Sequence, residues 1–164
     1  MPAIRFLALC LALLTAPYQA SGQAATVAFG SAKADPTLPV EVTADSLDVS
    51  QSDGSAEFIG NVRVDQGEMR LSAERVQVIY NQDQSAISRL VATGNVVLVN
   101  GPDAVEANQA DYTIDTGTVV LSGSVLLTQG PGVVASERMV VNLTEGTAQL
   151  SGRVKTVLNP EKKP

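Results

Sequence analysis

The fold is decided by the stretch Leu71-Ser72-Ala73-Glu74-Arg75-Val76-Gln77-Val78, in which a small residue follows one apolar residue and precedes two more. The motif recurs around Ala44, Ala107 and Ser136, so the four small residues lie 29, 34 and 29 positions apart. A period of this size is typical of one supersecondary unit repeated along a chain, in which no unit buries its apolar face alone. The sequence therefore predicts four tandem repeats of about 29 residues.

Apolar and polar residues alternate within each repeat, as in Val40-Glu41-Val42-Thr43. A period of two is the pattern of a half-buried β-strand. Turn-forming pairs such as Asp53-Gly54, Thr116-Gly117 and Glu145-Gly146 separate the alternating runs. No stretch shows sustained helical spacing, so the chain is expected to be all-β with antiparallel strands.

The alternation changes phase at each small residue. Val42 and Ala44 occupy even positions in the first repeat, whereas Leu47 and Val49 occupy odd ones. Such a phase change predicts a bulge or corner that bends the strand and re-aims its side chains. Aligned corners would fold the sheet into a V or a roll with one continuous interior.

A glycine also recurs in each repeat, at Gly60, Gly94, Gly123 and Gly152. Glycine inside a strand often marks a bend, so these glycines predict a second corner.

The first residues form a separate segment. Arg5 precedes a short apolar run over residues 6–16, and small residues follow it. This is the three-part pattern of a secretory signal peptide, with cleavage expected after Gly22 or Ala24, and the run is far shorter than the ~20 residues of a spanning helix. We therefore expect residues 1–24 to be a signal peptide. Residues 25–38 are expected to be a flexible leading segment, residues 39–158 the domain, and residues 159–164 a disordered tail.

The composition excludes several classes of function. The chain has 17 acidic and 11 basic residues and a net charge of −6, which disfavours nucleic acid as a partner. It has no histidine, and its one cysteine, Cys10, lies in the expected signal peptide. Serine-triad, thiol and most zinc chemistry are therefore excluded. Carboxylate pairs such as Asp111 and Asp115 would suit a polysaccharide-cleaving enzyme, but solvated outward positions explain them better. The sequence predicts no enzyme and no cofactor.

The apolar face predicted inside the bend permits two interpretations. Aliphatic side chains usually form a closed, dry core. However, the chain has only three phenylalanines, three tyrosines and no tryptophan. An interior filled mainly by valine and leucine can leave an apolar groove that accepts hydrocarbon chains. Both interpretations stay open at this point.

The two ends of the predicted stack carry exposed strand edges. The first edge is expected near residues 40–49 and the last near residues 150–158. Unpaired backbone groups at such edges can accept a strand from another molecule, so head-to-tail stacking is expected. A structural β-filament with a dry core and no lipid cargo is the alternative function.

Several segments resemble one known family. They are residues 39–49, residues 58–67, residues 71–78, residues 119–125 and the closing Arg153-Val154-Lys155-Thr156-Val157-Leu158. In this order they resemble the LptA/OstA-like family of periplasmic lipopolysaccharide-transport bridge proteins, over essentially the whole chain after the signal peptide.

The resemblance implies a β-jellyroll that is open at both ends and whose interior shields the acyl chains of lipopolysaccharide in the periplasm. It implies edge-strand stacking with an LptC-like inner-membrane partner, with an LptD-like outer-membrane partner and with further copies of the chain. The lipid-facing positions that the resemblance implies are Val40, Val42, Tyr80, Leu98, Tyr112 and Ile114. Phe58 lies on the same predicted inward face and is added to this set.

Overall fold

The computed structural model describes residues 25–30, 35, 37–50 and 54–158. The predicted signal peptide (residues 1–24) and the predicted tail (residues 159–164) lie outside the described residues. The described residues form strands and no helix. The strands are β1 (Ala25–Ala28), β2 (Glu41–Thr43), β3 (Ser46–Val49), β4 (Ala56–Gln66), β5 (Met69–Tyr80), β6 (Ile87–Asn100), β7 (Asp103–Thr113), β8 (Thr118–Gln129), β9 (Gly132–Asn142), β10 (Thr147–Ser151) and β11 (Lys155–Leu158).

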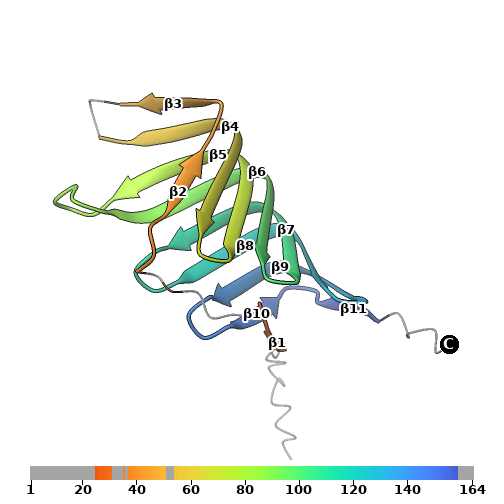
Figure 1. Ribbon diagram of the computed structural model, residues 1–164. Helices are drawn as coiled ribbons and strands as arrows, with labels where there is room; N and C mark the ends of the chain where they lie inside the picture. Colours follow the sequence, from red (N-terminus) through yellow and green to blue (C-terminus); the bar gives the residue numbers. More distant parts are fainter. Residues whose placement is uncertain (1–24, 31–34, 36, 51–53, 159–164) are drawn as a thin grey trace, which may run out of the picture.

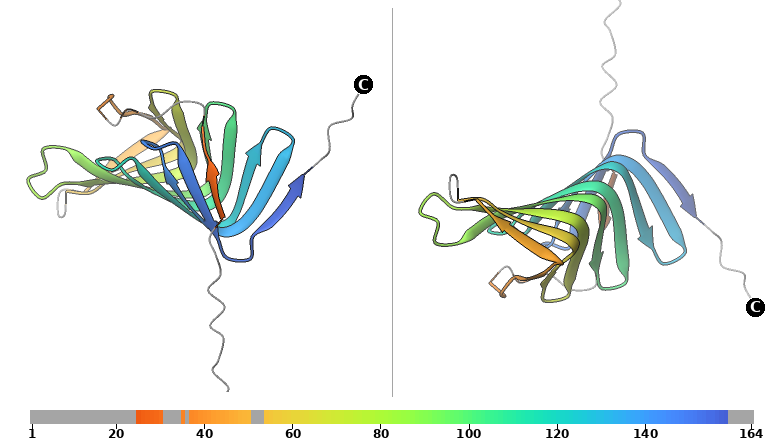
Figure 2. Two further views of the ribbon diagram at one scale, coloured as in Figure 1. Left: turned by 90° about the horizontal axis from the view of Figure 1, so that it is seen from below. Right: turned by 90° about the horizontal axis from the view of Figure 1, so that it is seen from above.

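All strands belong to one antiparallel sheet, which confirms the all-β jellyroll predicted from the sequence (Figure 1). Strands β4 to β10 follow one another as a meander, each paired with the next. The short strands β2 and β3 both pair with β4 at one end, and β10 and β11 both pair with β9 at the other. The sheet is open at both ends, and each long strand is bent near its middle, so the sheet is folded lengthwise into a V (Figure 2).

The bend comes from a bulge that recurs between neighbouring strands. Between β4 and β5, for example, the pairing jumps from Ile59 to Val62. Gly60 and Asn61 therefore oppose the single residue Glu74, and both have a positive φ, of 81° and 46°. Two residues opposite one make the bulged strand locally longer than its partner, which bends the strands and increases their twist.

The sequence predicted that the repeated glycines mark a second corner of the sheet. This prediction is wrong. Gly94, on β6, lies on the same line of bends as Ala73 and Glu74, on the adjacent strand β5. The phase change on one strand and the glycine on the next are two halves of one bulge. The same pairing of a bend glycine with the residue after a small residue holds for Gly60 with Asp45, Gly94 with Glu74, Gly123 with Asn108 and Gly152 with Glu137.

The line of bends divides the sheet into two arms. The first arm contains residues 25–28, 46–49, 56–59, 75–80, 87–93, 109–113, 118–122, 138–142 and 147–151. The second arm contains residues 41–43, 62–66, 69–72, 96–100, 103–106, 125–129, 132–136 and 155–158. The core lies between the arms, because the inward side chains of both arms are apolar and buried.

The beginning of the expected flexible leading segment, residues 25–38, forms a strand. Residues Ala25–Ala28 form β1, which pairs antiparallel with β10 at the far end of the first arm. The side chain of Phe29 is fully buried in the core, and its backbone N–H donates to the carbonyl oxygen of Gly146 at 3.0 Å. The sheet therefore includes residues before residue 39, because the backbone groups of β1 pair with those along β10.

No helix among the described residues is both long enough and apolar enough to cross a membrane.

Candidate functional site

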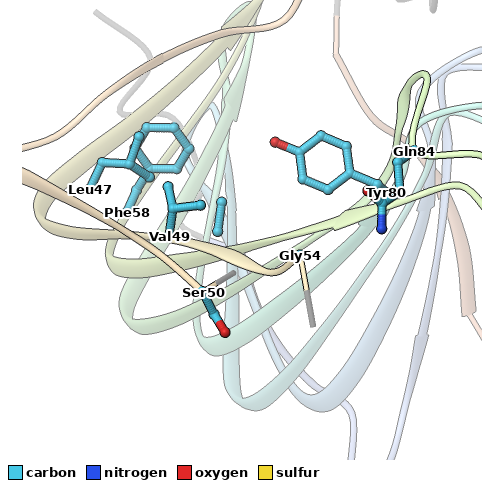
Figure 3. Close-up of a pocket in the computed structure, with 8 residues that line it drawn as sticks. Leu47, Val49, Ser50, Gly54, Phe58, Tyr80 and Gln84 are labelled. Carbon is cyan, nitrogen blue, oxygen red and sulfur yellow. The ribbon is translucent and has the colours of Figure 1, made fainter. Parts of the chain in front are cut away.

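The interior of the V is open to solvent at the edge formed by β3. A cavity of about 360 Å³ lies there between β3 and β4 on one side and the end of β5 on the other. Its lining residues are Leu47, Val49, Ser50, Gly54, Ala56, Phe58, Tyr80 and Gln84. The ring of Tyr80 points across the cavity toward Leu47, Val49 and Phe58 (Figure 3). We call this cavity the edge pocket.

The apolar lining of the edge pocket is exposed because β3 is the outermost strand at one end of the first arm. Leu47 and Val49 alternate with Ser46 and Asp48, so their side chains lie on the inward face, opposite Phe58 and Ala56 of β4. No strand follows β3 on its outer side among the described residues. Leu47 is consequently 50% exposed and Val49 63% exposed. Water therefore contacts apolar side chains here that would be covered anywhere else along the arm.

The rest of the interior is closed. The central inward side chains of both arms have almost no contact with solvent, among them Val76, Leu98, Val119, Leu121 and Leu127. Close packing of this kind excludes a separate ligand from that part of the interior.

A hydrogen-bonded connection crosses the interior between the arms. The hydroxyl of Tyr112, on the first arm, donates to the side-chain carbonyl oxygen of Gln66, at the end of the second arm. The side-chain amide nitrogen of Gln66 donates in turn to the backbone oxygen of Leu38 at 2.9 Å. Tyr112 and Gln66 are both buried. The connection holds the arms together and joins them to the segment that leads into β2.

Comparison with known proteins identifies the chain's relatives. Residues 41–147 match the family described as "LptA/(LptD N-terminal domain) LPS transport protein". The chain belongs to this family.

A solved structure has the same fold: LptH, the LptA-homologous periplasmic component of the conserved lipopolysaccharide-transport device of Pseudomonas aeruginosa. The TM-score is 0.68 at 19% sequence identity, and the match covers 77% of this chain and 99% of that one. No curated protein sequence matches the chain. Members of the LptA/LptD N-terminal-domain family are non-enzymatic components of lipopolysaccharide transport, so the chain is a transport protein and not an enzyme. The described residues also contain no cluster of three or more metal-ligating side chains.

The structure places the residues that the resemblance implied in three environments. Phe58 and Tyr80 line the edge pocket, and Tyr80 is 38% exposed. Val40 and Val42 are half-buried and pack against the core beside β4. Leu98, Tyr112 and Ile114 are buried in the closed part of the interior. The pairing of β4 with β5 therefore places Phe58 and Tyr80 around one cavity, whereas the other five lie elsewhere.

Two pocket residues were absent from the implied set. Leu47 and Val49 are the most exposed apolar residues of the edge pocket. The phase change after Ala44 was the signal that could have found them, because it turns both side chains to the inward face.

The buried phenol of Tyr112 makes the stability of this LPS-transport protein sensitive to alkaline pH. Burial raises the pKa of Tyr112 to about 12. An unfolded tyrosine ionises near 10, so the folded state keeps its proton over a range in which the unfolded state loses it. The resulting stabilisation is complete below about pH 10 and is lost as the pH rises toward 12. We expect a loss of about 1–2 kcal/mol, because Gln66 keeps part of the surroundings polar.

Urea denaturation at pH 8 and pH 11.5 measures this loss. The Tyr112→Phe variant is expected to show a smaller loss than the wild-type chain, because it lacks the ionising group. Tyr80→Phe is the matched control, since it removes a tyrosine hydroxyl from a partly exposed position outside the closed core. An equal loss in the wild-type chain and in Tyr112→Phe would contradict the assignment to Tyr112.

Proposed function

We propose that the chain is a periplasmic bridge that carries lipopolysaccharide by shielding its acyl chains between the two arms, with the edge pocket as the first binding position. The observation that carries the proposal is the exposure of Leu47, Val49 and Tyr80 around one cavity at an open end of the sheet. Membership of an LPS-transport family supports lipopolysaccharide as the cargo. The match to the periplasmic LptH supports the compartment, together with the signal peptide expected at residues 1–24.

The proposed mechanism is passive transfer. An acyl chain that enters the edge pocket leaves water at a gain of about 0.8 kcal/mol for each shielded CH₂ group. No bond forms or breaks, so direction must come from an energy-consuming partner. The phosphorylated head group would stay outside, because the protein is acidic overall.

The connection between Tyr112, Gln66 and Leu38 limits how far an acyl chain can enter. While the connection is intact, Leu98, Tyr112 and Ile114 remain within the closed core. Lipid contact with these three residues requires the arms to separate. Shallow binding in the edge pocket requires no such change.

The two strand edges are proposed to link the bridge to its neighbours. β2 and β3 form one edge, and β11 with the β1-covered β10 forms the other. An LptC-like inner-membrane partner, an LptD-like outer-membrane partner and further copies of the chain would add their strands at these edges.

A tryptophan reporter tests the proposal directly, because the chain contains no tryptophan of its own. In a Val49→Trp variant, purified lipopolysaccharide is expected to shift the fluorescence emission to shorter wavelength, since the indole passes from water into hydrocarbon. The Asp48→Trp variant is the control: its side chain lies on the outward face of the same strand and should show no shift.

Leu47→Asp in the reporter background is expected to weaken binding about 10- to 100-fold, because burial of a leucine side chain contributes about 1.5–3 kcal/mol. Its folding stability should change little, since half of the side chain is already exposed.

The closed core favours the second candidate function, a structural β-filament without lipid cargo. Leu98 and Val119 are completely buried by the chain's own side chains. If Val49→Trp shows no shift at saturating lipopolysaccharide while the protein still assembles, the filament function replaces the proposed one.

A further inference from the structure

The two edges of the first arm differ in one respect. At one end, β3 has no neighbour on its outer side among the described residues. At the other end, the outer side of β10 is covered by β1, a strand of the same chain whose residues are more than 100 positions away in sequence. Figure 1 shows β1 at this end, beside β10.

The position of β3 on β4 provides a reference. Leu47 pairs with Phe58, and Val49 pairs with Ala56. Phe58 and Ala56 are the second and fourth residues before the bend glycine Gly60. β3 runs away from the bend, antiparallel to β4.

β1 occupies the corresponding place on β10. Ala25 pairs with Leu150, and Val27 pairs with Ala148. Leu150 and Ala148 are the second and fourth residues before the bend glycine Gly152. β1 also runs away from the bend, antiparallel to β10, and it has the same length of four residues as β3. Register, direction and length therefore all agree.

We propose that β1 is a removable edge strand that holds the place of β3 from a second copy of this chain, so that head-to-tail stacking requires β1 to leave β10. The inference rests on the proposed function, which places a neighbouring molecule at this edge. It adds that the edge is occupied within the single molecule and that the second copy competes with β1 for it.

The second arm fits the same occupant. Its outer strand, β11, has no neighbour beyond it among the described residues. On β4, the residue opposite Thr43 of β2 is Arg63, and the charge of Glu41 lies close enough to act on Arg63. Counted from the bend glycine, Lys155 of β11 corresponds to Arg63. A second copy whose β2 pairs with β11 would therefore bring Glu41 near a positive charge again.

A few contacts at the end of β1 hold this strand in place on the sheet. Phe29 is fully buried, and the backbone N–H of Gly30 donates to a carboxylate oxygen of Asp103 at 2.8 Å. The side-chain amide of Gln129 donates to the backbone oxygen of Ala28 at 2.8 Å. These contacts lie at the end of β1, so the strand is anchored mainly through Phe29 and Gly30. A second copy must replace them, which sets a concentration threshold for stacking.

A disulfide lock tests the competition. Thr26 and Gln149 are exposed and directly opposite each other in the β1–β10 pair, which suits a disulfide between cysteines placed there. Cys10, in the expected signal peptide, is the only native cysteine, so the double variant Thr26→Cys/Gln149→Cys carries one cysteine pair in the mature protein. After oxidation with oxidised glutathione, we expect the threshold for association in sedimentation velocity to rise at least tenfold. Reduction of the same sample should restore it.

Further single variants identify the strand that occupies this edge. Asp48 of β3 corresponds to Thr26 of β1, so mixing Asp48→Cys copies with Gln149→Cys copies is expected to give an intermolecular disulfide. Mixing Asp48→Cys copies with Thr128→Cys copies is the control, because Thr128 is exposed on the central strand β8 and should not react. Phe29→Ala weakens the anchor of β1 and is expected to lower the association threshold.

Equal association of the oxidised and reduced double variant would overturn the inference, because a locked β1 would then not compete. Absence of association in every form, including Phe29→Ala, would overturn it as well. Either result leaves the fluorescence of Val49→Trp with lipopolysaccharide unaffected. Failure of the edge competition is therefore distinguishable from failure of lipid binding.

Discussion

Replacement of Gly94 by alanine is expected to lower the free energy of unfolding by about 2–4 kcal/mol. Gly94 has a φ of +82°, a left-handed conformation that costs an L-residue about 1–2 kcal/mol. A Cβ atom there would also lie 2.9 Å from Cβ of Glu74 on the neighbouring strand, so Glu74 would have to move. That movement would disturb the hydrogen bond from Asn95 to Glu74. Urea denaturation of the purified variant measures the loss.

Gly130→Ala is the matched control for Gly94→Ala. Gly130 also has a positive φ, of 51°, but it lies in the turn between β8 and β9 and has no atom within 4 Å of the added Cβ. Only the conformational cost applies, so a loss of about 1 kcal/mol is expected. Equal losses for Gly94→Ala and Gly130→Ala would show that the close packing of the bend contributes nothing to stability.

The bend at Gly94 also shows which part of the fold the sequence predicted well. The phase change at Ala73 and the recurrence of Gly94 were both visible, and both mark bends in the structure. Their common location was not visible. It depends on the pairing of β5 with β6, and register is set between strands rather than along one strand.

β1 is a strand that the sequence did not predict. The stretch from Ala25 to Phe29 is short and follows the expected signal peptide, so composition favoured a flexible segment. Its stability as a strand comes from β10, more than 100 residues later, and from the burial of Phe29. No local pattern records such a partner. The strand was therefore missed because its pairing partner is distant in sequence. The two halves of each bulge were predicted as separate corners for the same reason, since they lie on different strands.

The edge pocket lies between these cases. Phe58 was placed on the inward face and Tyr80 was implied by the family resemblance, and both side chains line the pocket. Alternation cannot tell an inward residue in the centre of a sheet from one at its edge. Leu98 has the same inward pattern as Phe58, but it lies on β6, where neighbouring strands cover it on both sides.

Leu98→Ala is expected to separate stability from lipid binding. Leu98 is completely buried, so its truncation leaves a cavity and should lower the free energy of unfolding by about 2–5 kcal/mol. If acyl chains bind in the edge pocket with the core closed, the folded variant should bind lipopolysaccharide with an affinity within about threefold of the wild-type chain, a difference below about 1 kcal/mol. Urea denaturation and the fluorescence of Val49→Trp measure the two quantities on the same protein.

Leu47→Ala is the reciprocal variant, since Leu47 lines the edge pocket and is half exposed. It should lower stability by less than about 1 kcal/mol and weaken lipopolysaccharide binding more than Leu98→Ala does. The reverse result has a definite structural meaning. If Leu98→Ala weakens binding tenfold or more, acyl chains reach the centre of the interior. The connection between Tyr112 and Gln66 must then open during binding, and Tyr112→Phe should make that opening easier and raise the affinity for lipopolysaccharide.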